Sequence, residues 1–389
     1  MKVLVFMSQF FLLNGAERLA VELAEGLNQH GVHADILSMY TKDLPGVAEA
    51  TNELLDRGIP SVHFLGMRIH SPLTGVARGI MKLRSLIKEH KYDIVETSVV
   101  SPTVIATWAT LGLPARHVAG LHQVYRRDRE NKKHHRVWRR SLAFNRRTRY
   151  YAVSDYVASR WVSYSGTSPR HIRRIYNGIP NDCFEAISER EQVRKELEIP
   201  GQSHLAIYVG RLAAYKGSDV LLEALLPVLD ERNMYLLYIG EPDLDIEGTR
   251  EMLERMDNLL AGKNGSGRVR FLGYRKDVPR LMAAADVLVH PARSEGFGLT
   301  LVEAMAAGLP VVTTNIEGIP EVLAKTDCLM VPPDNPGALC DAVLATLDRT
   351  PGEIAAAVEK GRKRAEEFRM NGRINKMFSL YEDVLRGRF

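Results

Sequence analysis

The stretch 295–310 reads EGFGLTLVEAMAAGLP. Its first glycines, Gly296 and Gly298, allow backbone N–H groups to approach a ligand closely because glycine has no Cβ atom. From Leu299 onward the pattern is that of a helix, so these amides lie at the positive end of the helix dipole. The stretch therefore predicts a phosphate site at the start of a helix.

The same stretch carries two glutamates, Glu295 and Glu303, eight positions apart. Two carboxylates do not suit phosphate alone, but they suit a ligand whose phosphates adjoin hydroxyls, as in a sugar nucleotide. One alternative concerns Glu303, which fits a capping box with Thr300 and would then only satisfy a backbone amide. That alternative leaves Glu295 and the glycines unexplained, so we favour ligand contact.

Two basic residues stand upstream of this stretch. Arg211 ends a predicted strand at 205–211, and Lys216 lies where the next helix is expected to begin. A cation at a helix N-terminus is unfavourable unless an anion offsets it. A diphosphate would do so, with Arg211 as a bidentate donor and Lys216 as a point charge. The alternative is a solvated Lys-Gly turn. The stretch is not a P-loop, because a P-loop has these two residues in the reverse order.

Short β-rich runs alternate with helical patterns along the whole chain, which indicates an α/β protein with parallel sheets. The strand candidates are 2–7, 33–40, 62–65, 93–98, 116–122, 149–154, 205–211, 234–240, 269–273, 286–290, 310–314 and 328–331. The turn-forming segment 177–182 divides them into two sets, so we predict two doubly wound domains. They are placed at residues 1–178 and 179–365, followed by a closing helical segment at 366–389.

The composition is that of a soluble globular protein, with 45% apolar and 25% charged residues. The three cysteines show neither metal-ligand nor disulfide spacing, which favours a reducing cytoplasm. The apolar run at 2–7 is interpreted as a buried strand rather than a signal peptide, because Ser8 and Gln9 interrupt it. No stretch approaches the roughly 20 apolar residues that span a bilayer.

The net charge of +5 is unevenly distributed, because residues 125–150 carry eleven Lys or Arg against two acidic side chains. This stretch is open to interpretation as a solvated helix, a nucleic-acid surface, or a surface that binds an anionic membrane or a substrate. Its interleaved aromatic residues favour the membrane. The proposed patch consists of Arg126, Arg127, Lys132, Lys133, Arg136, Trp138, Arg139 and Arg140.

Three further positions bear on the chemistry. His122 closes the strand candidate at 116–122, and ligands of parallel sheets bind at such carboxyl ends. Gly15 begins a helix and permits close approach of a phosphate, but the loop before it lacks the dinucleotide-binding glycine fingerprint. The segment 243–245 matches an Asp-x-Asp metal-binding pattern in what reads as a solvated loop. We expect no required metal and no cofactor.

Taken together, these motifs resemble those of the retaining glycosyltransferases of the GT-B fold, in the group called glycosyltransferase family 4. The resemblance covers essentially the whole chain. It is carried by Gly210-Arg211-Leu212, Lys216-Gly217, Glu295-Gly296-Phe297-Gly298, Glu303-Ala304, Gly15-Ala16-Glu17, His122, Ser154 and Asn177-Gly178. It implies two Rossmann-like domains that face a central cleft, with the final helix crossing back to the first domain.

The resemblance also implies roles for individual residues. Arg211 and Lys216 would hold the diphosphate of the donor and stabilise charge on the leaving group. Glu295 would face the donor sugar, Glu303 would bind the ribose hydroxyls, and His122 would hydrogen-bond the transferred sugar. Further donor contacts are implied for Gly15, Tyr274, Arg275, Gly296, Phe297, Gly298, Leu299 and Thr300.

The implied reaction is metal-independent transfer of a sugar, with retention of configuration, from a UDP- or GDP-sugar donor. The acceptor would be a lipid-linked glycan, such as a lipopolysaccharide or cell-surface polysaccharide precursor, at the cytoplasmic face of the inner or plasma membrane. One alternative keeps this chemistry with a soluble small-molecule acceptor. A more distant one, a nucleic-acid-binding protein, explains none of the other motifs. The sugar, the base, the acceptor and the oligomeric state stay open.

Overall fold

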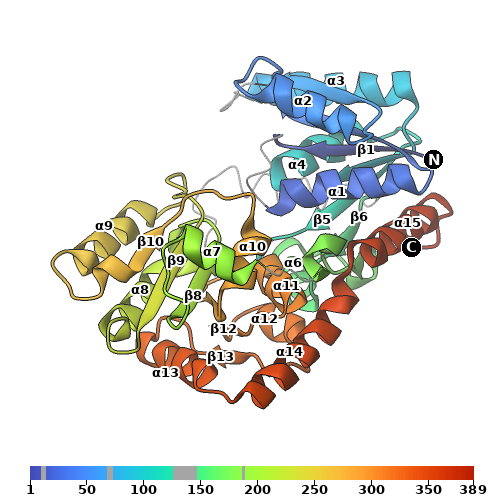
Figure 1. Ribbon diagram of the computed structural model, residues 1–389. Helices are drawn as coiled ribbons and strands as arrows, with labels where there is room; N and C mark the ends of the chain where they lie inside the picture. The colour runs from blue at the N-terminus through green and yellow to red at the C-terminus, as the bar shows by residue number, and fades with distance from the viewer. Residues whose placement is uncertain (10–14, 68–72, 126–146, 186–188) are drawn as a thin grey trace. The chain divides into compact units, whose positions relative to one another are not determined.

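The computed structural model describes residues 1–9, 15–67, 73–125, 147–185 and 189–389. Contacts between Cα atoms divide the chain into two units (Figure 1). Unit 1 holds residues 1–178 together with 370–389, and unit 2 holds residues 179–369. The predicted basic patch, from Arg126 to Arg140, lies outside the described residues.

Unit 1 is built on a seven-stranded parallel sheet with the strand order β3-β2-β1-β4-β5-β6-β7. The strands are β1 (Lys2–Met7), β2 (His33–Tyr40), β3 (Val62–Met67), β4 (Ile94–Thr97), β5 (Arg116–Leu121), β6 (Arg149–Ala152) and β7 (Ile172–Arg174). The first six lie at predicted positions, and β7 was missed. This edge strand is three residues long and carries two arginines, so it has no apolar run to reveal it.

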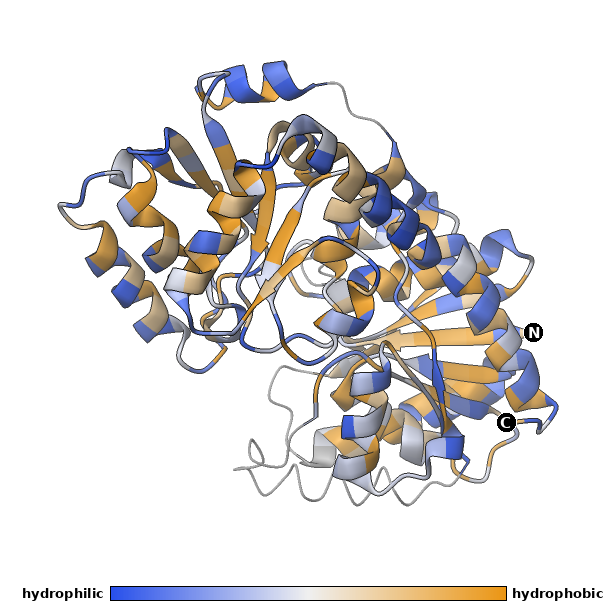
Figure 2. Ribbon diagram, turned by 90° about the horizontal axis from the view of Figure 1, so that it is seen from below, coloured by the Kyte–Doolittle hydropathy of each residue, from blue (hydrophilic) through white to orange (hydrophobic). Residues whose placement is uncertain are grey.

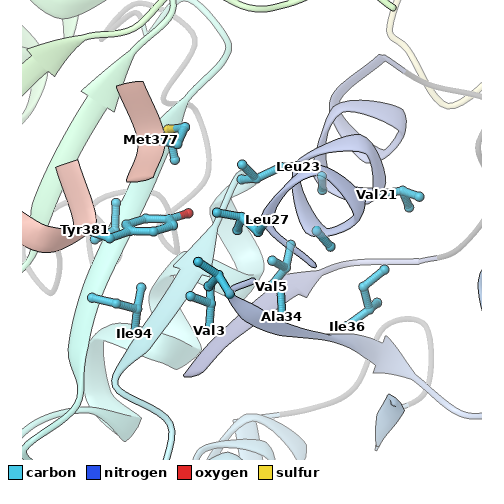
Figure 3. Close-up of a cluster of buried hydrophobic side chains, with 14 of the residues drawn as sticks. Val3, Val5, Val21, Leu23, Leu27, Ala34, Ile36, Ile94, Met377 and Tyr381 are labelled. Atoms are coloured by element: carbon cyan, nitrogen blue, oxygen red, sulfur yellow. The ribbon is translucent and has the colours of Figure 1, made fainter. Parts of the chain in front are cut away.

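The helices of unit 1 are α1 (Gly15–Gln29), α2 (Val47–Asp56), α3 (Leu73–His90), α4 (Val100–Ala109), α6 (Asp155–Ser165) and α15 (Met370–Leu385). The predicted apolar stripe of α1 is confirmed, because Leu23 and Leu27 are fully buried. Helix α15 joins this core from the end of the chain: its Met377 and Tyr381 point toward Leu23 and Leu27 (Figure 3). Unit 1 is therefore completed by residues that follow unit 2 in the sequence.

Unit 2 is built on a six-stranded parallel sheet with the order β10-β9-β8-β11-β12-β13. The strands are β8 (His204–Val209), β9 (Met234–Ile239), β10 (Val269–Phe271), β11 (Val287–His290), β12 (Val311–Thr314) and β13 (Leu329–Val331). The helices include α7 (Arg190–Glu196), α8 (Ser218–Leu225), α9 (Thr249–Leu260), α10 (Val278–Ala284), α11 (Leu299–Ala307), α12 (Ile319–Val322), α13 (Pro336–Leu347) and α14 (Pro351–Ala365). All six strands were predicted.

The strands of both sheets are mainly hydrophobic, whereas the helices mix hydrophobic and hydrophilic residues (Figure 2). This pattern is expected of parallel sheets, which are covered by helices on both faces. No helix in the described part of the chain combines the length and the apolar character needed to cross a membrane.

Each sheet has a point at which the strand order reverses. In unit 1 it lies between β1 and β4, and in unit 2 it lies between β8 and β11. At such a point the connections from the two neighbouring strands run to opposite sides and leave room for a ligand beyond the carboxyl ends. The loops after β8 and β11 are those that carry Lys216 and Glu295.

The closing helical segment is not continuous. Helix α14 begins with a capping box formed by Thr350 and Glu353 and ends at Ala365. A 3₁₀ turn covers residues 366–368, and Arg369 has an extended backbone before α15 begins. The predicted segment at 366–389 thus starts with residues of unit 2, and the chain passes into unit 1 only after this break.

Unit 1 should lose stability as the pH falls from 7.5 to 5, and His117 should account for part of the loss. The ring is 1% exposed, and burial lowers its pKa from 6.5 to about 3. Because the folded pKa lies below the unfolded one, the stabilisation is complete above pH 6.5 and is lost between pH 6.5 and 3. By pH 5 the free energy of unfolding should have fallen by ~2 kcal/mol through this histidine.

The measurement is urea denaturation followed by tryptophan fluorescence, since all three tryptophans precede residue 178. The control is His117→Gln, which lacks the titrating ring and should lose ~2 kcal/mol less over the same pH range. An equal pH dependence in the two proteins would contradict the assignment.

Candidate active site

A largely buried ion pair joins the loops that follow β8 and β11. The Nζ atom of Lys216 lies 2.5 Å from Oε2 of Glu295, and each side chain is only 16% exposed. The two residues are 79 positions apart in the sequence. The fold brings them together because β8 and β11 are neighbours in the sheet.

Both members of this pair are charged. Burial opposes ionisation of Glu295, but the Lys216 ammonium and His290 together hold the pKa of its carboxyl well below the usual range. Burial likewise opposes the charge of Lys216, yet Glu295 raises the pKa of this amine above its ordinary value. His290 ends β11, and its Nε2 lies 3.4 Å from the Glu295 carboxylate. Burial lowers the pKa of His290, so its ring is neutral.

The loops approach closely for two local reasons. Gly217 has a φ of +68°, and a Cβ atom there would lie 2.1 Å from the carbonyl oxygen of Pro291. The backbone N–H of Arg293 donates to the carbonyl of Tyr215 at 2.8 Å. The Arg293 guanidinium donates to both carboxylate oxygens of Asp219, each at 2.9 Å. Arg293 therefore ties the loop of Lys216 to the loop that follows β11, through hydrogen bonds to residues on either side of Lys216 in the sequence.

Glu317 holds the backbone at Glu295 from a third loop. Its Oε2 accepts from the Ser294 hydroxyl at 2.8 Å and from the Glu295 N–H at 2.7 Å. Its own φ is +46°, which is uncommon for a residue with a side chain. Glu317 was not predicted, because it lies 22 residues beyond Glu295 and belongs to no local motif. His290 and Arg293 were not predicted as site residues either.

Arg211 is also paired with an acid. Its guanidinium contacts the Asp243 carboxylate and donates to the Tyr215 hydroxyl at 2.8 Å. The side chain of Arg211 is 41% exposed. Asp243 is the first acid of the Asp-x-Asp segment, so one carboxylate of this segment forms an ion pair with Arg211. Within the described residues, no group of three or more His, Cys, Asp or Glu side chains is placed to hold a metal ion.

Helix α11 begins at Leu299, as predicted. Its N-cap is Gly298, with a φ of +83°, and no side chain caps it. Thr300 therefore lies inside the helix, and the capping-box alternative for Thr300 and Glu303 is wrong. Glu303 is half-buried on the following turn.

The remaining residues of unit 2 with predicted donor contacts differ in their exposure and in their partners. Phe297 as a whole is only 2% exposed, and its ring packs edge-on against Phe368 with 5.5 Å between centroids. Its backbone N–H donates to Oε1 of Glu295 at 3.4 Å. Tyr274 and Arg275 follow β10, which ends two residues earlier than predicted. Tyr274 is 44% exposed. The Arg275 guanidinium is bound to Asp277 at 2.7 and 2.8 Å.

Two predicted residues belong to unit 1. Gly15 is the exposed first residue of α1. His122 follows β5, and its Nε2 lies 3.2 Å from the Tyr151 hydroxyl oxygen. Burial and the positive charge of Arg373 lower the pKa of His122 to about 3, so the ring is neutral.

Comparison with known proteins identifies the family. Residues 203–349 match the model described as glycosyl transferases group 1, and residues 13–182 match the model described as glycosyltransferase family 4. D-inositol 3-phosphate glycosyltransferase of Corynebacterium glutamicum (strain R) is 30% identical over 225 residues, which is 56% of this chain and 53% of that protein. The chain thus spans about half the length of the first relatives it matches.

Other similarities extend over nearly the whole chain. Lipopolysaccharide glucosyltransferase WaaG of Escherichia coli (strain K12) is 26% identical over 358 residues, 90% of each protein. The crystal structure of Anabaena Alr3699/HepE in complex with UDP has a TM-score of 0.82 at 21% identity and covers 98% of this chain and 100% of that one. The two Rossmann-like sheets are those of the GT-B fold. With both family models and this fold in agreement, the chain belongs to the group 1 glycosyltransferases of family 4.

Proposed function

We propose that the protein is a retaining glycosyltransferase that moves a sugar from a nucleotide-sugar donor. The observation that carries this proposal is the buried Lys216–Glu295 pair at the strand-order reversal of unit 2. A diphosphate suits the Lys216 ammonium, the Arg211 guanidinium and the amides at the start of α11. A carboxylate beside them suits the hydroxyls of the adjoining sugar. UDP or GDP would be the carrier, and the UDP complex of HepE supports a nucleotide of this kind.

In the proposed reaction, the bond between the anomeric carbon and the diphosphate oxygen breaks while the acceptor oxygen bonds to the same face of that carbon. The acceptor proton passes to the departing diphosphate, so charge and atoms balance. The protein's contribution is electrostatic: Lys216 and Arg211 stabilise the negative charge that develops on the leaving group. These cations supply the stabilisation that a metal ion provides in other transferases, so we propose a metal-independent reaction. His122 is proposed to hydrogen-bond a hydroxyl of the transferred sugar.

For the acceptor, we propose a lipid-linked glycan of the lipopolysaccharide type, presented at the cytoplasmic face of the membrane. The name of WaaG supports this choice, because the similarity covers 90% of both chains. A soluble phosphorylated polyol is a second candidate, which the D-inositol 3-phosphate glycosyltransferase relative supports.

The direct test of the proposal is a thermal-shift panel of UDP- and GDP-sugars followed by a transfer assay with the sugar nucleotide that stabilises the protein. A shift in melting temperature with transfer of that sugar is the expected result. If no sugar nucleotide in the panel is bound or turned over, the proposal fails.

Lys216→Met should reduce turnover by about 10²–10³-fold, because it removes a cation that acts on the leaving group. It should also weaken UDP or GDP binding roughly tenfold or more, the effect of losing a charge-assisted hydrogen bond. The matched control is Lys263→Met, in an exposed turn of the same unit. Wild-type turnover in Lys216→Met would remove this residue from the active site.

Asp243→Asn should strengthen UDP or GDP binding about threefold, because the partly exposed Arg211 guanidinium loses its competing carboxylate. The control is Asp245→Asn, the other acid of the Asp-x-Asp segment, which should leave affinity unchanged. Isothermal titration in the presence of a chelator measures both. If wild-type turnover requires Mg²⁺ and both variants abolish it, the segment is a metal site and the present assignment is wrong.

The two acceptor classes predict different behaviour on membranes. With a lipid-linked acceptor, anionic vesicles should sediment the protein at low salt and release it at high salt, since screening weakens attraction to the leaflet. With a soluble acceptor, the vesicles should not retain the protein, and D-inositol 3-phosphate is the first compound to assay.

A further inference from the structure

A buried polar cluster lies at the carboxyl ends of β4, β5 and β6 in unit 1. We call it the Glu96 cluster, and it consists of Glu96, Ser98, His122 and Tyr151. The Glu96 and Tyr151 side chains are fully buried, and Ser98 is 6% exposed. Buried polar groups are normally hydrogen-bonded, so the partners within the cluster account for most of its polar atoms.

The hydrogen bonds of the cluster have a defined direction. Oε1 of Glu96 accepts from the Tyr151 hydroxyl at 2.7 Å and from the Ser98 hydroxyl at 3.0 Å. Burial raises the pKa of the Tyr151 hydroxyl, so it keeps its proton. Burial also raises the pKa of the Glu96 carboxyl, but Oε1 accepts from both hydroxyls and so carries no hydrogen of its own. A phenol has one proton, and Tyr151 donates it to this oxygen. Toward His122 the Tyr151 oxygen can therefore only accept, at 3.2 Å, and Nε2 of His122 must carry the hydrogen.

This direction fixes the other nitrogen of the ring. Because His122 is neutral, a hydrogen on Nε2 leaves Nδ1 with a lone pair. Nδ1 is shielded from solvent and has no hydrogen-bond partner among the described residues. A buried acceptor without a partner is unfavourable, and a hydroxyl donor that reached it would remove that penalty.

Gly120 makes the contact between the two rings possible. It lies opposite Tyr151 in the register of β5 and β6. A Cβ atom at Gly120 would lie 2.4 Å from the Tyr151 hydroxyl oxygen and 2.8 Å from Nε2 of His122. Any larger residue would push the two groups apart, so the glycine is a second, independent sign that the contact is built into the sheet.

We infer that Tyr151 and Glu96 are positioning residues that hold His122 as the Nε2–H tautomer, so that its Nδ1 accepts a hydrogen bond from a hydroxyl of the transferred sugar. This inference rests on the proposed function for the identity of the hydroxyl donor. The tautomer itself follows from the hydrogen bonds and the burial of the Glu96 cluster and does not depend on what the donor is.

The first measurement is a two-bond ¹H–¹⁵N correlation spectrum of the full chain with labelled histidine. The His122 signals are assigned by their loss in His122→Gln. A protonated Nε2 and an unprotonated Nδ1, unchanged between pH 5 and 8, are expected. A protonated Nδ1, in either the other tautomer or the imidazolium, would overturn the inference. Since this experiment needs no change to the cluster, it decides the matter even if cluster variants fold poorly.

The second measurement compares Tyr151→Phe with Tyr150→Phe. Tyr150 is its neighbour on β6, is 2% exposed, and packs against Trp161 on the other face of the sheet. In Tyr151→Phe the Nε2–H signature should be lost or mixed, and kcat should fall about tenfold, the effect of one hydrogen bond. The Kd of UDP or GDP, whichever stabilises the wild type, should not change. Tyr150→Phe should match the wild type throughout.

A Tyr151→Phe protein with the wild-type tautomer and the wild-type kcat would overturn the inference. Failure of the proposed function has a different signature, because the wild-type protein would then transfer no sugar while the His122 spectrum still reported its tautomer.

Discussion

The contact between Lys216 and Glu295 is the interaction on which the site of unit 2 depends. Removing two charges from water costs several kcal/mol for each ion, so a buried pair persists only where its members stay in contact. That contact needs two loops from neighbouring strands to lie unusually close together. Gly217 permits the approach, and the bond from Arg293 to Asp219 secures it. The close approach of the loops keeps the two charges in contact, and the attraction between the charges in turn holds the loops together.

Both cations of the candidate site are paired with carboxylates of the chain, Arg211 with Asp243 and Lys216 with Glu295. A diphosphate bound as proposed would have to share these cations with Glu295 and Asp243 or displace the two acids. The cost of separating the ion pairs would then offset part of its attraction to the cations. The pairs differ in how readily they separate, because the side chain of Arg211 is 41% exposed and that of Lys216 only 16%. Exposed pairs are weak and exchange with little loss, whereas a buried pair resists separation. The Arg211 side of the site is thus the more adaptable one.

The sequence predicted every described strand except β7. Continuous apolar runs such as 2–7 and 234–240 correctly predicted buried parallel strands, because burial on both faces requires apolar residues throughout. Lys216 was predicted from its place at the start of a helix, and Glu295 from the glycines and the second glutamate that accompany it. Their direct contact was not foreseen, since it depends on which strands become neighbours, and that order is set by packing over the whole unit.

The features that were missed share the same physical cause. Strand β7 has two arginines among three residues and forms through pairing with β6 rather than through an apolar pattern. Glu317 supports the backbone of Glu295 from a different loop, and no spacing rule connects them. The capping-box alternative failed because the left-handed Gly298 begins the helix before Thr300 is reached. Local chemistry predicted the strands and the start of α11 around the candidate site, but not how the side chains there pair.

Helix α15 has a consequence for the order in which the molecule forms. Met377 and Tyr381 belong to the core of unit 1, yet the ribosome makes them after every residue of unit 2. Domains generally fold as units during synthesis, and unit 2 is contiguous, so it can close as soon as its own residues have emerged. Unit 1 cannot complete its core until α15 has been made, and until then the surface of α1 that α15 will cover stays exposed to water. The N-terminal half of the nascent polypeptide is therefore the last to mature, and this is the stage at which a chaperone would find an apolar surface to hold.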